Sequence, residues 1–117
     1  MARLRDFLDV VAHKRAFLST RKSNQAFVTN VSLLRALLHD TGKAINVLFF
    51  GDDFATNVHR RTAGHHLFRT QADLWEGLCD WECARLTKPT KPLNARDTWV
   101  KFYSELDCGP LLDQANL

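Results

Sequence analysis

His39 and Asp40 are adjacent side chains whose types suit the binding of a metal ion. They follow a stretch, residues 33–38, whose leucines recur at helical spacing and predict the end of a buried helix. Successive side chains on a helix point about 100° apart, so both groups could reach one ion only if Asp40 lies where the backbone leaves the helix. Gly42 is expected to make that turn, because glycine readily ends helices.

The electrostatics of a helix end also bear on Asp40. A carboxylate in the last turn is disfavoured by the negative end of the helix dipole, by about 0.3–1 kcal/mol. A compensating cation is therefore expected, and Lys43 or a metal ion could supply it. The alternative is an ordinary helix end, in which His39 interacts favourably with the dipole and Asp40 is solvated.

The segment 37–43, Leu-Leu-His-Asp-Thr-Gly-Lys, resembles the central signature of the HD-domain superfamily of metal-dependent phosphohydrolases. The resemblance implies an earlier metal-binding histidine about one helix upstream and a later aspartate on a following helix. His13 matches the first, and Asp80 or Asp73 matches the second. Gly64-His65-His66 is similar to the Gly-His segment of some members, among them the HD domains of tRNA nucleotidyltransferases, so His65 and His66 are further candidate ligands.

The resemblance also implies an activity, the hydrolysis of a nucleotide or another phosphate ester. Asp40 and Lys43 are then the expected catalytic residues, with a divalent metal ion as cofactor. Imidazole and carboxylate ligands suit Mn, Fe, Co, Ni or Zn, and Mg where oxygen ligands dominate. Such an ion lowers the pKa of a bound water and stabilises charge on the phosphate. The cations expected to bind the phosphate are Lys43, Arg60, Arg61 and Arg69.

This sequence departs from the family in two respects. The chain is shorter than most HD domains, and the distance from the His-Asp pair to the later aspartate is compressed. A domain that keeps the fold but has lost the metal is therefore a second form of the hypothesis.

The segment 57–70 is the densest basic stretch, with three arginines, three histidines and no acid. It could grip the phosphate of a substrate, contact a nucleic-acid backbone, or be a solvated loop. The alternative function is thus a non-enzymatic accessory or adaptor subunit that binds nucleic acid or a larger protein complex through this basic patch.

Size and composition favour one compact domain, residues 1–112, followed by a loose tail, 113–117. The 117 residues are 45% hydrophobic and 25% charged, with a net charge of +3. No apolar run approaches the ~18 residues needed to span a bilayer. A cytoplasmic protein is expected, and an organellar matrix location stays open because the first 22 residues read as a basic amphipathic helix.

The three cysteines are expected to be free, buried thiols, because they are odd in number and no export signal accompanies them. Cys79 and Cys83 share a helix face and could join His65 or His66 in a zinc site. Their spacing is not that of structural zinc sites, however, and Cys79 fits the apolar side of its helix.

The elements that must position these groups are helical, and the expected fold class is all-α with about five helices. The first helix should bury a stripe through Leu4, Phe7 and Leu8, which leaves His13 on its polar side. Residues 45–50 could form a strand or a helix, and helical or irregular structure is favoured because no second strand exists to pair with them. The expected helices are 3–19, 24–39, 54–61, 71–86 and 95–106, with caps at Ser23 or Asn24, at Thr70 and at Asn94.

Overall fold

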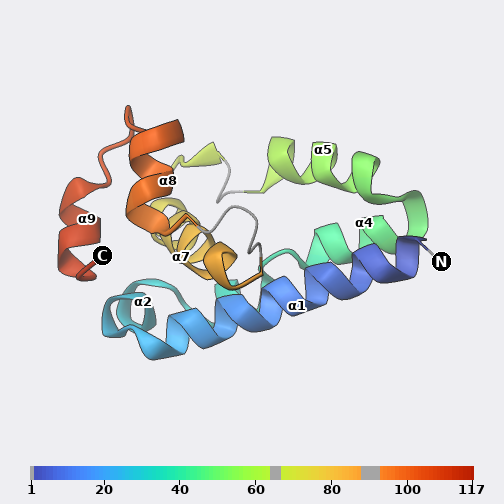
Figure 1. The fold of residues 1–117 in the computed structure, drawn as a ribbon, viewed down its shortest axis with the longest axis horizontal. Helices are drawn as coiled ribbons and strands as arrows, with labels where there is room; N and C mark the ends of the chain where they lie inside the picture. The colour runs from blue at the N-terminus through green and yellow to red at the C-terminus, as the bar shows by residue number, and fades with distance from the viewer. Residues whose placement is uncertain (1, 64–66, 88–92) are drawn as a thin grey trace.

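The computed structural model describes residues 2–63, 67–87 and 93–117. These ranges are helical and contain no strand, which confirms the all-α prediction (Figure 1). No helix in the described ranges has the length and apolar character required to cross a membrane. The helices are α1 (Ala2–Ser23), α2 (Gln25–Asn30), α3 (Leu33–Leu38), α4 (Thr41–Phe50), α5 (Asp52–Thr62), α7 (Gln71–Thr87), α8 (Ala95–Phe102) and α9 (Gly109–Gln114).

The long helix α1 connects two packing centres (Figure 1). Its C-terminal half packs on α7, and Phe17, which is fully buried, belongs to the main core there. Its N-terminal half packs on α4, where Val10 joins Val47 and Ala55 in a much smaller core. Lys14 ties α1 to α4 by donating a hydrogen bond to Thr41 Oγ1 at 2.9 Å.

The buried face of α1 agrees only in part with the one predicted, and Phe7 is partly buried against the smaller core as expected. Leu4 and Leu8 are about half exposed, whereas the buried positions are Val10, Phe17 and Thr20. The prediction was wrong for Leu4, Leu8 and His13, because two partners, α4 and α7, pack along the helix and together select a stripe that includes His13. His13 therefore points into the protein. Its neighbours in the sequence had indicated the opposite, a position on the polar side of the helix.

The expected helix 24–39 is interrupted at Val31, whose backbone is extended (φ −112°, ψ 109°). Asn24 caps α2 by accepting a hydrogen bond from the Ala26 amide, and Ser32 caps α3 by accepting one from the Arg35 amide. A serine at this position lets a second helix begin in a new direction. As a result Phe27 and Val31 are buried, whereas the leucines predicted to be buried are exposed, namely Leu33, Leu34, Leu37 and Leu38.

The helix α7 forms the centre of the main core. It begins as predicted, with Thr70 Oγ1 accepting a hydrogen bond from the Asp73 amide at 3.1 Å. Trp75 and Trp81 are buried on it, and Trp99 packs against the same core. The three cysteines are free and buried, which confirms the prediction for them as well.

The C-terminal segment forms the short helix α9. Asn94 caps α8, but this helix ends at Phe102, and Gly109-Pro110 then begins α9, with the proline in its first turn. Leu111, Leu112 and Ala115 are buried in the main core. Within the segment 113–117, which was predicted to be a loose tail, Ala115 is buried and Leu117 is partly buried against the main core.

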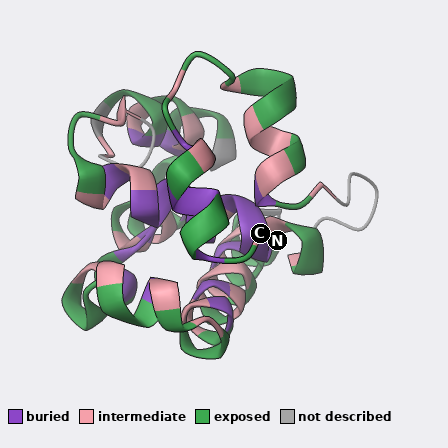
Figure 2. Cartoon of the chain, turned by 90° about the vertical axis from the view of Figure 1, so that its left-hand side faces the viewer, coloured by how far each residue is buried: buried purple, intermediate pink, exposed green. Residues whose placement is uncertain are grey.

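The smaller core leaves much of the apolar surface of α4 and α5 exposed. The opposite end of the molecule, which faces the viewer in Figure 2, has buried residues of the main core at its centre. Residues 45–50 are helical, as favoured, and α5 starts at Asp52, two residues before the predicted start at Phe54. Gly51 joins α4 to α5 with φ +90°, a conformation that favours glycine. The predicted end of this helix at Gly64 and the connection 88–92 lie outside the described residues. Several large apolar side chains of this region are exposed: Leu4, Leu8, Ile45, Leu48, Phe49, Phe50 and Phe54.

Candidate metal centre

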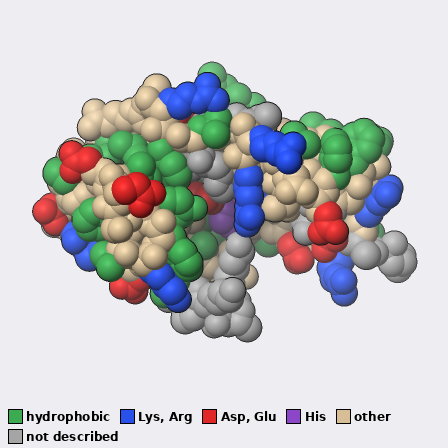
Figure 3. Space-filling model, turned by 90° about the horizontal axis from the view of Figure 1, so that it is seen from above, with side chains coloured by type: hydrophobic (Ala, Val, Ile, Leu, Met, Phe, Trp, Pro, Cys, Tyr) green, Lys and Arg blue, Asp and Glu red, His purple; other side chains and the backbone are tan. Residues whose placement is uncertain are grey.

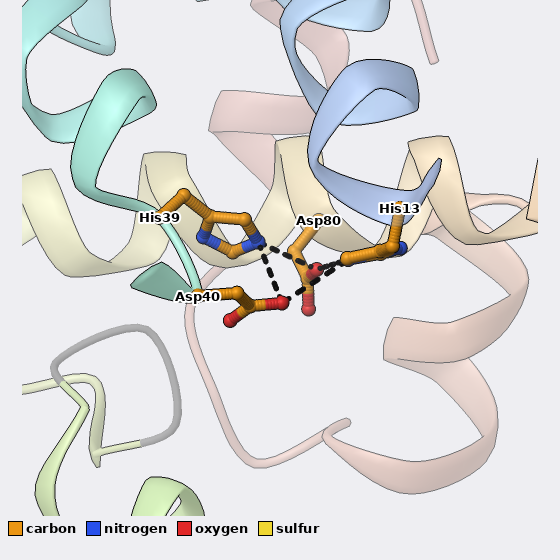
Figure 4. Close-up of side chains that lie close together, drawn as sticks. All are labelled: His13, His39, Asp40 and Asp80. Atoms are coloured by element: carbon orange, nitrogen blue, oxygen red, sulfur yellow. Dashed lines mark hydrogen bonds and ion pairs between the residues drawn. The ribbon is translucent and has the colours of Figure 1, made fainter. Parts of the chain in front are cut away.

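Four side chains from three parts of the chain meet between α1, α3 and α7 (Figure 4). They are His13 on α1, His39 and Asp40 in the connection from α3 to α4, and Asp80 on α7. Each offers one possible ligand atom, and these four atoms all lie within 4.8 Å of one another. The structure thus brings together the upstream histidine, the His-Asp pair and a later aspartate.

The connection between α3 and α4 explains how His39 and Asp40 both face this point. The helix α3 ends at Leu38, and Asp40 has a left-handed backbone (φ 59°, ψ 10°). Aspartate adopts this conformation more readily than most residues. The prediction that Gly42 makes the turn was wrong, because Gly42 lies inside α4. The turn comes two residues earlier, at the carboxylate itself.

Three of the distances in the cluster are those expected of ligands to one ion, whereas Nε2 of His13 lies at hydrogen-bond distance, 2.6 Å, from Oδ1 of Asp80. Nε2 of His39 lies 3.1 Å from Oδ1 of Asp80 and 3.5 Å from Oδ2 of Asp40, and Nε2 of His13 lies 3.6 Å from the same Asp40 oxygen. Neighbouring ligand atoms at about 2.0–2.2 Å from an ion are roughly 3–3.5 Å apart. Two imidazole nitrogens and two carboxylate oxygens form a donor set that suits Mn, Fe, Co, Ni or Zn.

The ring of His39 is held on several sides. Phe17 stacks on it with the ring centroids 3.9 Å apart and the planes 15° from parallel. Its Nδ1 lies 2.9 Å from Oε2 of Glu76, and its Nε2 contacts Asp80. Glu76 and Asp80 stand one turn apart on α7, so one helix face holds both nitrogens of the ring.

The electrostatics of the cluster favour positive charge. Burial by itself lowers the pKa of His39, but the hydrogen bonds to Asp80 and Glu76 and the charges of Asp80 and Asp40 outweigh it and raise that pKa to about 10. Burial raises the pKa of Asp80, whereas its contacts with His13 and His39 hold it well below its usual range. The carboxylates thus stabilise a cation at this point, which is the first requirement of a metal centre.

A cavity of about 520 Å³ adjoins the cluster. Figure 3 shows a recess in the middle of this face of the molecule, with a histidine side chain at its floor and a Lys or Arg side chain at its edge. The cavity wall combines apolar and polar groups. Its lining residues are Ser32, Leu34, Arg35, Leu38, His39, Asp40, Gly42, His59, Ala63 and Glu76.

The cations predicted to bind phosphate lie apart from this wall. Lys43 follows Gly42 on α4, Arg60 and Arg61 are exposed in the last turn of α5, and Arg69 is exposed before α7. The arginine that lines the cavity is Arg35. His65 and His66 lie outside the described residues, and so does their part in the zinc site suggested with Cys79 and Cys83.

Of the two aspartates considered as the later ligand, the structure places only Asp80 in the cluster. Asp73 instead accepts hydrogen bonds from Arg35 and from the backbone amides of Arg69 and Thr70. A carboxylate near the start of a helix is well placed for the free amides there. Asp73 therefore stabilises the start of α7.

Sequence reasoning did not single out Arg35 and Glu76, and it placed His59 only in the basic patch. Nε2 of His59 lies 2.7 Å from Oδ1 of Asp40, and Glu76 contacts His39. Spacing held a partial signal, because Glu76 precedes Asp80 by four residues and so shares its helix face. The contact of His59 with Asp40 depends on how α5 packs against α4, and this packing cannot be predicted from a local sequence pattern.

No protein-family model, curated protein or solved structure matches this chain.

Proposed function

We propose that this protein is a divalent-metal-dependent phosphohydrolase of the HD type that acts on a nucleotide or another phosphate ester. The observation that carries the proposal is the convergence of His13, His39, Asp40 and Asp80 beside a cavity. Their order along the chain also agrees with the resemblance of residues 37–43 to the HD signature. Bound there, a divalent ion would supply a water of lowered pKa and positive charge for the phosphate oxygens.

Arg35 is the side chain we assign to the substrate phosphate. Arg35 lines the cavity and its side chain is 35% exposed. Asp73 and Glu76 both contact Nη1, which fixes the direction of the planar group. A guanidinium offers five N–H donors in a fixed arrangement, so donors beyond those of Nη1 can face a phosphate oxygen in the cavity.

His59 is the side chain we assign to proton transfer. It is buried, lines the same cavity and contacts Asp40 at 2.7 Å, so its Nε2 is held in a defined direction. A histidine within hydrogen-bond reach of the reacting group can pass a proton to a leaving oxygen. In this proposal Arg35 binds the phosphate in place of Lys43.

Metal content and hydrolysis test the proposal together. Purified protein is expected to retain or bind Mn²⁺, Co²⁺ or Zn²⁺ and to hydrolyse p-nitrophenyl phosphate or a member of a nucleotide panel. Asp40→Asn should abolish both properties while keeping the fold, because asparagine also adopts the left-handed backbone that residue 40 requires. Asp113→Asn, at an exposed aspartate on α9, is the matched control.

The exposed apolar side chains of α1, α3, α4 and α5 favour a second function, that of a helical accessory subunit in a larger complex. The exposed Arg60, Arg61 and Arg69 could then contact nucleic acid. A protein that binds none of the three metals, and that binds single-stranded DNA equally well with Asp40→Asn, supports this second function. Loss of metal and activity in that variant supports the hydrolase.

A further inference from the structure

Glu76 contacts His39 on the side of the ring that faces away from the metal cluster. Its Oε2 lies 2.9 Å from Nδ1, whereas Nε2 is the nitrogen that faces Asp40 and Asp80. Glu76 is 5% exposed, and the His39 side chain is fully buried. Burying a carboxylate is costly unless it is paired, so its place beside this nitrogen indicates a specific interaction with His39.

The other carboxylate oxygen of Glu76 is held by a separate contact. Nη1 of Arg35 donates to Oε1 at 3.1 Å and also to Oδ1 of Asp73 at 2.8 Å. Asp73 is itself fixed by the backbone amide of Thr70 at the start of α7. Because Oε1 is engaged in this way, Oε2 is the oxygen that remains directed at His39.

We propose that Glu76 is a positioning residue of the metal centre, which sets the tautomer of His39. A neutral imidazole carries its proton on one nitrogen only, and the other nitrogen then has the free lone pair. A hydrogen bond from Nδ1–H to Glu76 keeps the proton there and leaves Nε2 as the metal ligand. Arg35 acts through Glu76 by fixing the direction of its carboxylate. The inference rests on the proposed metal-dependent function.

Cobalt titration distinguishes the proposed positioning role of Glu76 from a general contribution of this residue to folding. Co²⁺ is added to the wild type, to Glu76→Gln and to Glu76→Ala, and the visible absorption of bound cobalt reports affinity and geometry. Glu76→Ala should weaken binding by about 10–100-fold, the usual effect of losing such a partner. Glu76→Gln should lose less, because its amide oxygen can still accept the Nδ1 hydrogen bond.

Glu82→Gln is the matched control. Glu82 is also a buried glutamate of α7, but it contacts the Ala95 amide and Arg85. Its replacement should cost stability while leaving cobalt affinity within about twofold of the wild type. Equal weakening by Glu82→Gln and Glu76→Ala, or no weakening by Glu76→Ala, would overturn the inference.

Nitrogen NMR of His39 in the zinc-loaded wild type tests the tautomer directly and needs no variant. Nδ1 should carry a proton and Nε2 should show the shift of a metal-bound nitrogen. A metal bound at Nδ1 would overturn the inference even where Glu76→Ala does not fold. A wild type that binds neither cobalt nor zinc overturns the proposed function itself, whereas normal binding by Glu76→Ala overturns only the part assigned to Glu76.

Discussion

Oδ1 of Asp80 lies 2.6 Å from Nε2 of His13, although the two residues are 67 positions apart in the sequence. The contact crosses the packing of α1 on α7, the most extensive helix pair of the main core. The candidate metal centre is therefore part of the same interface that stabilises the fold. Changes in ion binding should accordingly be visible as changes in stability.

Metal ions should raise the melting temperature. An ion that binds only the folded state at a hundred times its dissociation constant adds about 2.7 kcal/mol, which for a domain of this size corresponds to roughly 10 °C. We expect this increase on adding Zn²⁺ or Co²⁺, and its reversal by EDTA. Asp80→Asn should show no increase, whereas Asp113→Asn should respond as the wild type does. Differential scanning fluorimetry provides the measurement.

The packing of α9 can be tested with two leucines. Leu112 is fully buried, so Leu112→Ala should lower the free energy of unfolding by about 2–5 kcal/mol. Leu38 is 60% exposed, and Leu38→Ala should change it by no more than about 0.5 kcal/mol. Urea titration followed by circular dichroism distinguishes the two. Similar losses at both positions would contradict the burial described for α9.

The caps that divide residues 24–39 into two helices should differ in their contributions. Ser32→Ala removes one cap and should cost about 1 kcal/mol. Asn24→Ala should cost more, because Asn24 caps α2 and its Nδ2 also donates a hydrogen bond to the Ala115 carbonyl at 3.0 Å. Urea unfolding of both variants gives the comparison, and a larger cost at Ser32 would contradict the contact between Asn24 and the Ala115 carbonyl at the end of α9.

The free energy of unfolding should fall between about pH 9 and 11 because the thiol of Cys108 is buried. Burial, with a smaller contribution from Asp107, raises the pKa of Cys108 to about 11, above the value of 9.0 for a free thiol. Between these two values the unfolded chain loses this proton and the folded chain keeps it, so the free energy of unfolding decreases as pH rises. One such thiol accounts for a slope of up to about 1.4 kcal/mol per pH unit.

Cys108→Ala isolates this contribution, because alanine cannot ionise. Its free energy of unfolding should fall less steeply between pH 9 and 11 than that of the wild type, as measured by urea titration at each pH. Identical slopes would show that Cys108 titrates normally in the folded protein.

Local patterns predicted much of the secondary structure. Thr70 and Asn94 cap α7 and α8 as expected, since a cap depends on hydrogen bonds within three residues of the chain. The turn beside Asp40 was expected in the right region but assigned to Gly42, because aspartate also tolerates the left-handed backbone. The short α9 was missed, since its stability comes from burial of Leu112 and not from local propensity.

The sequence by itself determined the helical class, the principal caps and the identity of His39 and Asp40 as an adjacent pair able to bind a metal ion, because these depend on spacing within one or two helical turns. Only the tertiary structure decided which distant groups meet them. The packing of α1 on α7 turns His13 inward, selects Asp80 over Asp73 and adds Glu76. The approach of His59 and the place of Arg35 on the cavity wall likewise depend on contacts between helices, which periodicity along one helix does not encode.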